Sequence, residues 1–206
     1  ANTTASLNTA VGGSSLGNNT TGDGNTAVGK DSMISNTTGR LSTALGVNAL
    51  YSHTTGLFNV GIGKDGGLGI TSGSYNTAVG SQTLFTSNTG SNNTAVGYGS
   101  LGATTTASNN TGIGYLALND NTTGTSNVAV GGLALDANTT ADSNTAVGYA
   151  SLSDNTTGTQ NTALGRAALG GNTTGNYNAG IGFLALAANT TGASNVAVGA
   201  YALDAN

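Results

Sequence analysis

Apolar and polar positions along this chain follow a pattern that repeats every 17 residues. The consensus unit is N-T-A-V-G-x-x-A-L-x-x-N-T-T-G-x-x, and successive units follow one another without insertion or deletion. The units begin at residues 8, 25, 42, 59, 76, 93, 110, 127, 144, 161, 178 and 195. Repeats of fixed length are typical of stacked architectures. A disordered tract would tolerate changes of length, so we expect one repeat array over residues 1–206.

The pattern inside each unit predicts a β-strand. In Thr-Ala-Val the Thr and Val side chains share one face of a strand and Ala takes the other. A helical repeat needs two helices and more than about 30 residues, and the abundant Gly, Thr, Val and Asn also disfavour helix. The sequence therefore predicts an all-β parallel β-solenoid (a β-roll or β-helix). One 17-residue coil per repeat gives about twelve coils, and stacking them at ~4.8 Å makes a rod of roughly 55–60 Å.

Stacked coils place equivalent residues above one another, so each column of the repeat predicts a ladder. Val, Ile or Leu precedes a fixed glycine in all twelve units, and Leu or Met follows that glycine by four residues, with Gly67 the exception. We expect these two apolar columns to form a thin core. The fixed glycine is expected at a corner with positive φ or at a close backbone approach. The candidate ladder residues are Val11, Val28, Val79, Val96, Val130, Val147, Leu16, Leu101, Leu118, Leu135, Gly29 and Gly131.

The Asn-Thr-Thr-Gly segment predicts a turn, with Asn and Gly at positions where left-handed conformations are tolerated. Stacked Asn side chains can pass amide hydrogen bonds from coil to coil. The expected members of this ladder are Asn121, Asn138, Asn155 and Asn172, with Asn121 and Asn138 about 5 Å apart. The same four residues and Asn189 begin Asn-x-Thr sequons and are candidate glycosylation sites. We interpret most of the sequons as a by-product of the ladder.

The segment 144–158, N-T-A-V-G-Y-A-S-L-S-D-N-T-T-G, resembles repeats in tail-fibre-like proteins of phages and bacteria. The motif is also distantly similar to the N-S-V-A-I-G repeat of YadA-like trimeric adhesin heads, which form parallel β-rolls. The resemblance implies an extracellular, cell-surface or virion location. The chain begins partway through a repeat and both ends lack caps, so we expect it to be part of a longer polypeptide. We also expect self-association by head-to-tail stacking, lateral packing or homotrimer formation.

Composition excludes several classes of partner. Charged residues make up 6% of the chain and its net charge is −4, so it has no basic patch for nucleic acid or anionic lipid. No stretch reaches the ~18 apolar residues of a membrane-spanning helix, so we expect no membrane insertion. The chain has no Cys, which rules out disulfides and thiolate metal sites.

Side chains suited to catalysis are few. His53 is the only histidine and replaces Asn in the Asn-Thr-Thr column, so we interpret it as a ladder substitution. Four aspartates lie at two neighbouring positions of their coils: Asp120, Asp136, Asp154 and Asp204. We interpret them as solvated corner residues, because the G-G-x-G-x-D pattern of calcium-binding rolls is absent. We therefore expect no enzyme activity, no cofactor and no metal site.

The segment 63–69, G-K-D-G-G-L-G, superficially resembles a phosphate-binding loop. It lacks the G-K-[ST] ending and a following helix. We interpret it as a local defect in which Gly67 replaces the core leucine and Leu68 is displaced by one position.

Aromatic residues form two broken stripes. Tyr98, Tyr115, Tyr149 and Phe183 all follow the fixed glycine, and Leu41, Phe58 and Tyr75 share another column in three consecutive coils. Such stripes are explained by corner packing, or by a contact face for another chain or for surface glycans.

The interpretation that we favour is a non-catalytic structural shaft segment of an extracellular or virion fibre or fibril, with adhesion as an additional role. The alternative is a binding module, such as an ice-binding or glycan-binding β-solenoid. Adjacent Thr-Thr side chains point to opposite faces of a strand, whereas a flat ice-binding array needs Thr-x-Thr. An enzyme is the least favoured class, because a repeat without insertions leaves no loops to build a groove.

Overall fold

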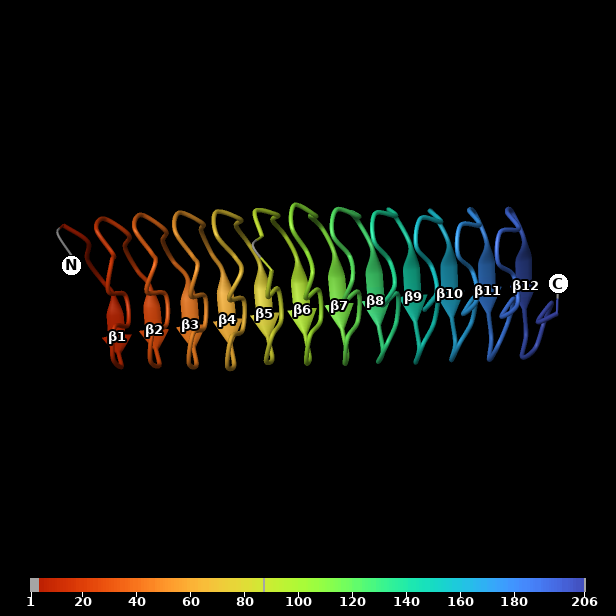
Figure 1. Cartoon of the computed structure of the whole chain (residues 1–206), viewed down its shortest axis with the longest axis horizontal. Helices are drawn as coiled ribbons and strands as arrows, with labels where there is room; N and C mark the ends of the chain where they lie inside the picture. Colours follow the sequence, from red (N-terminus) through yellow and green to blue (C-terminus); the bar gives the residue numbers. More distant parts are fainter. Residues whose placement is uncertain (1–3, 87, 206) are drawn as a thin grey trace.

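The computed structural model describes residues 4–86 and 88–205, which form a rod of stacked coils (Figure 1). Twelve three-residue strands lie in these residues. They are β1 (Thr9–Val11), β2 (Thr26–Val28), β3 (Thr43–Leu45), β4 (Val60–Ile62), β5 (Thr77–Val79), β6 (Thr94–Val96), β7 (Thr111–Ile113), β8 (Val128–Val130), β9 (Thr145–Val147), β10 (Thr162–Leu164), β11 (Ala179–Ile181) and β12 (Val196–Val198). They form one sheet in sequence order, with the chain termini at opposite ends of the rod (Figure 1). The predicted parallel β-solenoid is confirmed.

Every strand pairs with the next one in parallel and in the same register. Ala10 lies opposite Ala27 in β1 and β2, and Gly180 lies opposite Ala197 in β11 and β12. The offset between paired residues is always one repeat, so equivalent columns stack directly along the rod. The ladders expected from the unbroken 17-residue period are therefore present.

The core consists of the leucine column and the small residue at the middle of each strand. Leu101, Leu118 and Leu135 have no exposed surface, and Leu16 at the first coil is 8% exposed. Ala95 and its equivalents from the second coil onward face these leucines and are also buried, whereas Ala10 in the first coil is exposed. Burial of the predicted leucine ladder is thus confirmed.

The prediction that the valine column shares this core is wrong. The predicted core members Val11, Val28, Val79, Val96, Val130 and Val147 are exposed or half-buried. The interior has room for only one small side chain opposite each leucine. Gly61 takes the place of the strand alanine in its coil, and a Cβ added there would lie 2.7 Å from Cγ of Leu50. Because strand side chains alternate, burying the alanine forces its Thr and Val neighbours outward.

The fixed glycine is confirmed at a corner where a side chain is excluded. Gly29 and Gly131 both have φ of +135°. A Cβ on Gly131 would lie 2.5 Å from the carbonyl oxygen of Gly148 in the next coil. Positive φ and the close backbone approach therefore both require glycine here.

Left-handed conformations occur in the core leucine column and not in the Asn-Thr-Thr-Gly segment. Asn121 and Gly124 have ordinary φ, whereas the core residues Leu118 and Leu135 have φ of 52° and 53°. A bulky residue in this conformation costs roughly 1–2 kcal/mol, so tertiary contacts must hold it there. Leu118 is wholly buried, and its backbone N–H donates to the carbonyl of Ala134 at 3.0 Å.

Candidate functional site

From Asn121 to Asn189, the Asn-Thr-Thr asparagines form an uninterrupted hydrogen-bonded ladder inside the rod. Nδ2 of Asn138 donates to Oδ1 of Asn121 at 2.9 Å, and Asn155 and Asn172 extend the chain of amides at 3.0 Å per step. Each amide also donates to the carbonyl three residues later, as Asn121 does to Gly124 at 2.9 Å. The predicted contact between Asn121 and Asn138 across one coil is confirmed.

The same geometry overturns the candidate glycosylation sites. Asn121, Asn138, Asn155 and Asn172 have no exposed surface, and Asn189 is 3% exposed. In every case Nδ2, the atom that would carry the glycan, donates hydrogen bonds inside the coil. The folded coil therefore leaves no room for a sugar at these positions.

A second asparagine ladder runs along the first position of the repeat. Asn127 donates from Nδ2 to the carbonyl of Ala141 at 2.8 Å and accepts on Oδ1 from the backbone N–H of Asn144 at 2.9 Å. Ser42 maintains the ladder with its hydroxyl, which accepts from the backbone N–H of Asn59 at 3.0 Å. In the sequence this column marks the period of the repeat and was not expected to form a ladder of its own. The signal was present, because Asn occupies the column in every unit except the one that begins with Ser42.

His53 joins the two ladders. Its Nδ1 lies 2.8 Å from Oδ1 of Asn36 in one ladder, and its Nε2 lies 3.1 Å from Nδ2 of Asn59 in the other. A neutral ring with the proton on Nδ1 satisfies both contacts, donating to Asn36 and accepting from Asn59. Burial lowers the pKa of His53 to about 4, against a smaller opposing effect of a hydrogen bond with the backbone of Gly56. The ladder substitution expected for His53 is confirmed.

The ladder of Asn-Thr-Thr residues breaks in the coil that follows His53. Ile70 stands in the asparagine column, is wholly buried, and has its Cδ1 3.1 Å from a Cβ added to Gly67. Ile70 therefore fills the space that the missing leucine leaves, and the prediction that Leu68 is the displaced residue is wrong. Leu68 is only half-buried. Beyond the break, Nδ2 of Asn88 and Oγ1 of Thr104 are buried without a hydrogen-bond partner.

The predicted acidic corner lies at the surface, in three successive coils and in the last one. Asp120, Asp154 and Asp204 are exposed, and Asp136 is half-buried. Partial burial raises the pKa of Asp136, and the charges of Asp120 and Asp154 raise it further. Over residues 4–86 and 88–205, no group of three or more His, Asp, Glu or Cys side chains is placed to hold a metal ion.

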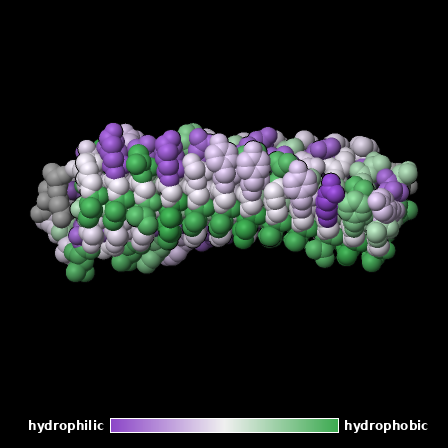
Figure 2. Space-filling model, turned by 90° about the horizontal axis from the view of Figure 1, so that it is seen from below, coloured by the Kyte–Doolittle hydropathy of each residue, from purple (hydrophilic) through white to green (hydrophobic). Residues whose placement is uncertain are grey.

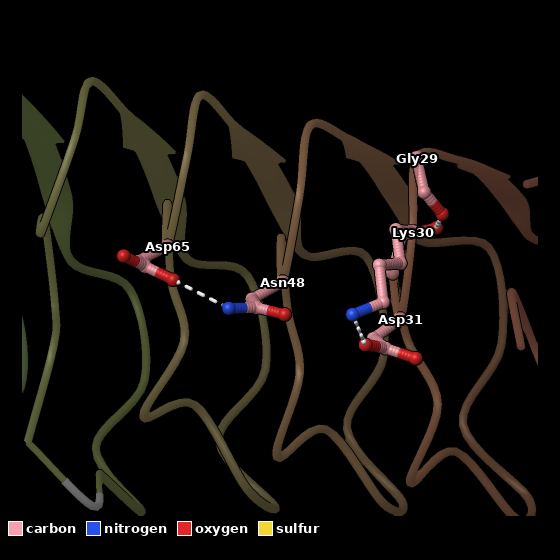
Figure 3. A network of polar contacts seen from close by, with 6 residues as sticks. Gly29, Lys30, Asp31, Asn48 and Asp65 are labelled. Atoms are coloured by element: carbon pink, nitrogen blue, oxygen red, sulfur yellow. Dashed lines mark hydrogen bonds and ion pairs between the residues drawn. The ribbon is translucent and has the colours of Figure 1, made fainter. Parts of the chain in front are cut away.

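A second charged corner carries two ion pairs, with the amide of Asn48 in the coil between them. Figure 3 shows the Lys30–Asp31 pair and the contact between Asn48 and Asp65. Nζ of Lys30 lies 3.5 Å from Asp31, and Nζ of Lys64 lies 3.3 Å from Asp65. Asn48 occupies the coil between the two aspartates and donates from Nδ2 to Asp65 at 2.9 Å. The lysines are well exposed, so the pairs add little to stability.

The aromatic stripe lies on the surface as short stacks. The rings of Tyr98 and Tyr115 stack with centroids 5.8 Å apart, and Tyr149 is 55% exposed beyond the gap at Gly132. Phe183 is half-buried, with the guanidinium of Arg166 5.6 Å from its ring centroid. The stripe is therefore a discontinuous surface edge.

The Asn-Thr-Thr threonines have different roles. In the interior coils the first hydroxyl is used inside the stack, as Thr122 Oγ1 donates to the carbonyl of Thr139 at 3.0 Å. The second, as at Thr123, is exposed. In such a coil only one threonine of the pair faces solvent freely.

No protein-family model, no curated protein and no solved structure matches the chain. Among the residues that the structure describes, no helix has the length and apolar character needed to cross a membrane.

Proposed function

We propose that the chain is a structural shaft segment of an extracellular or virion fibre, whose role is to supply length and stiffness. The observation that carries the proposal is the pairing of all twelve strands in one parallel register. Two internal asparagine ladders support it, because they tie each coil to the next by side-chain hydrogen bonds as well as by backbone ones. Such a design resists bending and sliding between coils.

The test is to change the length of the array by whole and partial coils. Deleting residues 127–143 removes one complete unit, so the protein should fold and the rod should shorten by ~4.8 Å in small-angle X-ray scattering. Deleting 128–143 removes one residue fewer and should disrupt the stack on one side of the deletion. Compact particles by electron microscopy, or equal tolerance of both deletions, would refute a shaft built from identical coils.

The alternative function is a glycan-binding or ice-binding module. The exposed stack of Tyr98 and Tyr115 favours glycan binding, because aromatic rings offer amphipathic contact area. A glycan array with the wild-type chain and a Tyr98→Ala/Tyr115→Ala variant tests this function. Thermal hysteresis measured on the same pair tests ice binding, which should not depend on these two rings.

A further inference from the structure

The face of the β-sheet that points away from the core carries two parallel rows of side chains. We call these two rows together the outer face. The Thr row is the first residue of each strand and the Val row is the third. None of their members is buried, and Leu45, Ile113 and Leu164 of the Val row are 48%, 39% and 47% exposed. Figure 2 shows hydrophobic residues gathered in a row along the length of the rod.

The outer face has the same chemistry in every coil. The Val row consists of Val11, Val28, Leu45, Ile62, Val79, Val96, Ile113, Val130, Val147, Leu164, Ile181 and Val198. The Thr row consists of Thr9, Thr26, Thr43, Val60, Thr77, Thr94, Thr111, Val128, Thr145, Thr162, Ala179 and Val196. Neither row contains a charged residue. The column after the fixed glycine is also at the surface, yet it varies from Lys30 to Tyr98 and Gly132.

Strand propensity does not explain the Val row. Thr is as good a strand former as Val on a half-exposed surface, and it is the commonest residue in the neighbouring row. Thr nevertheless never occurs in the Val row in twelve copies of the unit. Core packing does not explain the row either, because the side chains point away from the core. A large exposed apolar strip of this kind marks an interaction surface.

We propose that the outer face packs against the outer face of a second copy of this chain. The apolar side chains repeat once per coil, at ~4.8 Å along the rod. A partner must have the same spacing to keep contact over twelve coils, and a second copy has it by construction. Rows of identical side chains from in-register parallel strands can interdigitate as a dry zipper. The two rows carry no charges that would repel one another across the interface.

The size of the face agrees with a weak specific interface. Twelve coils at ~4.8 Å and three-residue strands about 10 Å long give roughly 550 Å² per copy, or about 1,100 Å² in total. This lies just below the range of about 1,200–2,000 Å² for stable specific complexes. Affinity depends on packing rather than on area, so we take the weak end of the range for specific interfaces and expect a reversible pair with a Kd on the order of micromolar.

The first experiment measures mass by analytical ultracentrifugation at concentrations up to roughly 100 µM, well above that Kd. The wild-type chain should self-associate. A Val79→Lys/Val96→Lys/Val130→Lys variant should weaken association at least tenfold. The matched control, Thr89→Lys/Thr106→Lys/Thr140→Lys, adds the same charge to exposed positions of the same coils and should associate as the wild type does. Circular dichroism checks that both variants keep their strands.

The second experiment does not depend on the lysine variant folding. The chain has no cysteine, so a single Ile113→Cys substitution places one thiol in the Val row of a central coil. Oxidation should yield a covalent dimer, whereas Thr123→Cys in the same coil should stay monomeric. Val28→Cys near one end should cross-link to itself only if the two rods run in the same direction.

A monomeric wild-type chain would overturn the proposal, as would equal cross-linking of Ile113→Cys and Thr123→Cys. Association that survives in a folded lysine variant would overturn it as well. None of these results bears on the shaft role, because a single rod of the expected length would still be seen by scattering.

Discussion

Two regions of the rod differ in whether their buried polar side chains have hydrogen-bond partners. In residues 110–194, the ladder from Asn121 to Asn189 runs without a gap, and each amide after Asn121 donates to the asparagine in the coil before it. In residues 59–109, Ile70 and Thr104 occupy the same column, and the buried Asn88 and Thr104 each have an unpaired atom. A ladder side chain is therefore satisfied by its neighbours along the rod, and one substitution affects several coils.

The interrupted region still continues the solenoid because the second ladder passes through it unchanged. Asn76 accepts from the backbone N–H of Asn93 at 3.0 Å, as Asn144 does from Asn161 at 2.9 Å. The two ladders are thus redundant in the regular region, and only one remains where the other breaks.

The largest expected effect is the loss of that remaining ladder. Asn76→Ala should lower the free energy of unfolding by about 4 kcal/mol, because it leaves buried backbone groups without partners where no second ladder helps. Asn144→Ala removes the equivalent two contacts in the regular region and should cost about 2 kcal/mol, whereas Asn76 loses in addition the bond that its Oδ1 accepts from Nδ2 of Asn93 at 3.1 Å. Urea unfolding followed by circular dichroism measures both. Equal losses would show that the ladders act independently.

The next effect is the pH dependence introduced by His53. Its pKa is lowered in the fold to about 4 from the ordinary 6.5, so the unfolded chain binds the proton more readily between these values. The contribution of neutral His53 to the free energy of unfolding should be fully present above pH 6.5. It should fall by about 3 kcal/mol as the pH drops to about 4. His53→Asn restores the consensus ladder residue and should remove this part of the acid sensitivity. Parallel pH titrations of unfolding compare the two, and overlapping curves would contradict the prediction.

Substituting Gly67 and Ile70 by the consensus residues restores the regular coil, and a double-mutant cycle measures the coupling between the two positions. Gly67→Leu alone should cost about 2 kcal/mol because Ile70 already fills the space, and Ile70→Asn alone should cost a similar amount by emptying it. The two changes together rebuild the consensus positions and should return stability to within about 0.5 kcal/mol of the wild type. Additive losses in urea unfolding would mean that Ile70 does not substitute for the missing leucine.

The smallest expected effect is an increase in the free energy of unfolding. Thr104→Val removes a buried hydroxyl that has no partner and keeps the shape of the side chain, so stability should rise by about 1 kcal/mol. Thr122→Val is the control in the regular region. Its hydroxyl donates to Thr139, so the same change should destabilise the protein by about 1 kcal/mol. A thermal melt of each variant, read by circular dichroism, shows the sign.

The sequence predicted which repeat positions stack into ladders, but not which of these ladders are buried or which groups they bind. The Asn-Thr-Thr column predicted a ladder because stacking identical amides lets each satisfy the next. The sequence did not show that burial would close these asparagines to glycans. The first-position asparagines were overlooked as a ladder, since their partners are backbone groups that no sequence pattern marks. Ile70 was missed because it is buried only where Gly67, which has no side chain, leaves the space of the core leucine unfilled.

The sequence by itself determined the period, the strand and the register of the stack. A 17-residue unit repeated without a change of length can satisfy every copy only if the copies occupy equivalent positions. The alternation in Thr-Ala-Val also established that Thr and Val share one face. Only the tertiary structure decided which face is inside. The coil leaves space for at most a methyl group opposite each leucine, so Ala or Gly is buried and the larger Val is turned outward.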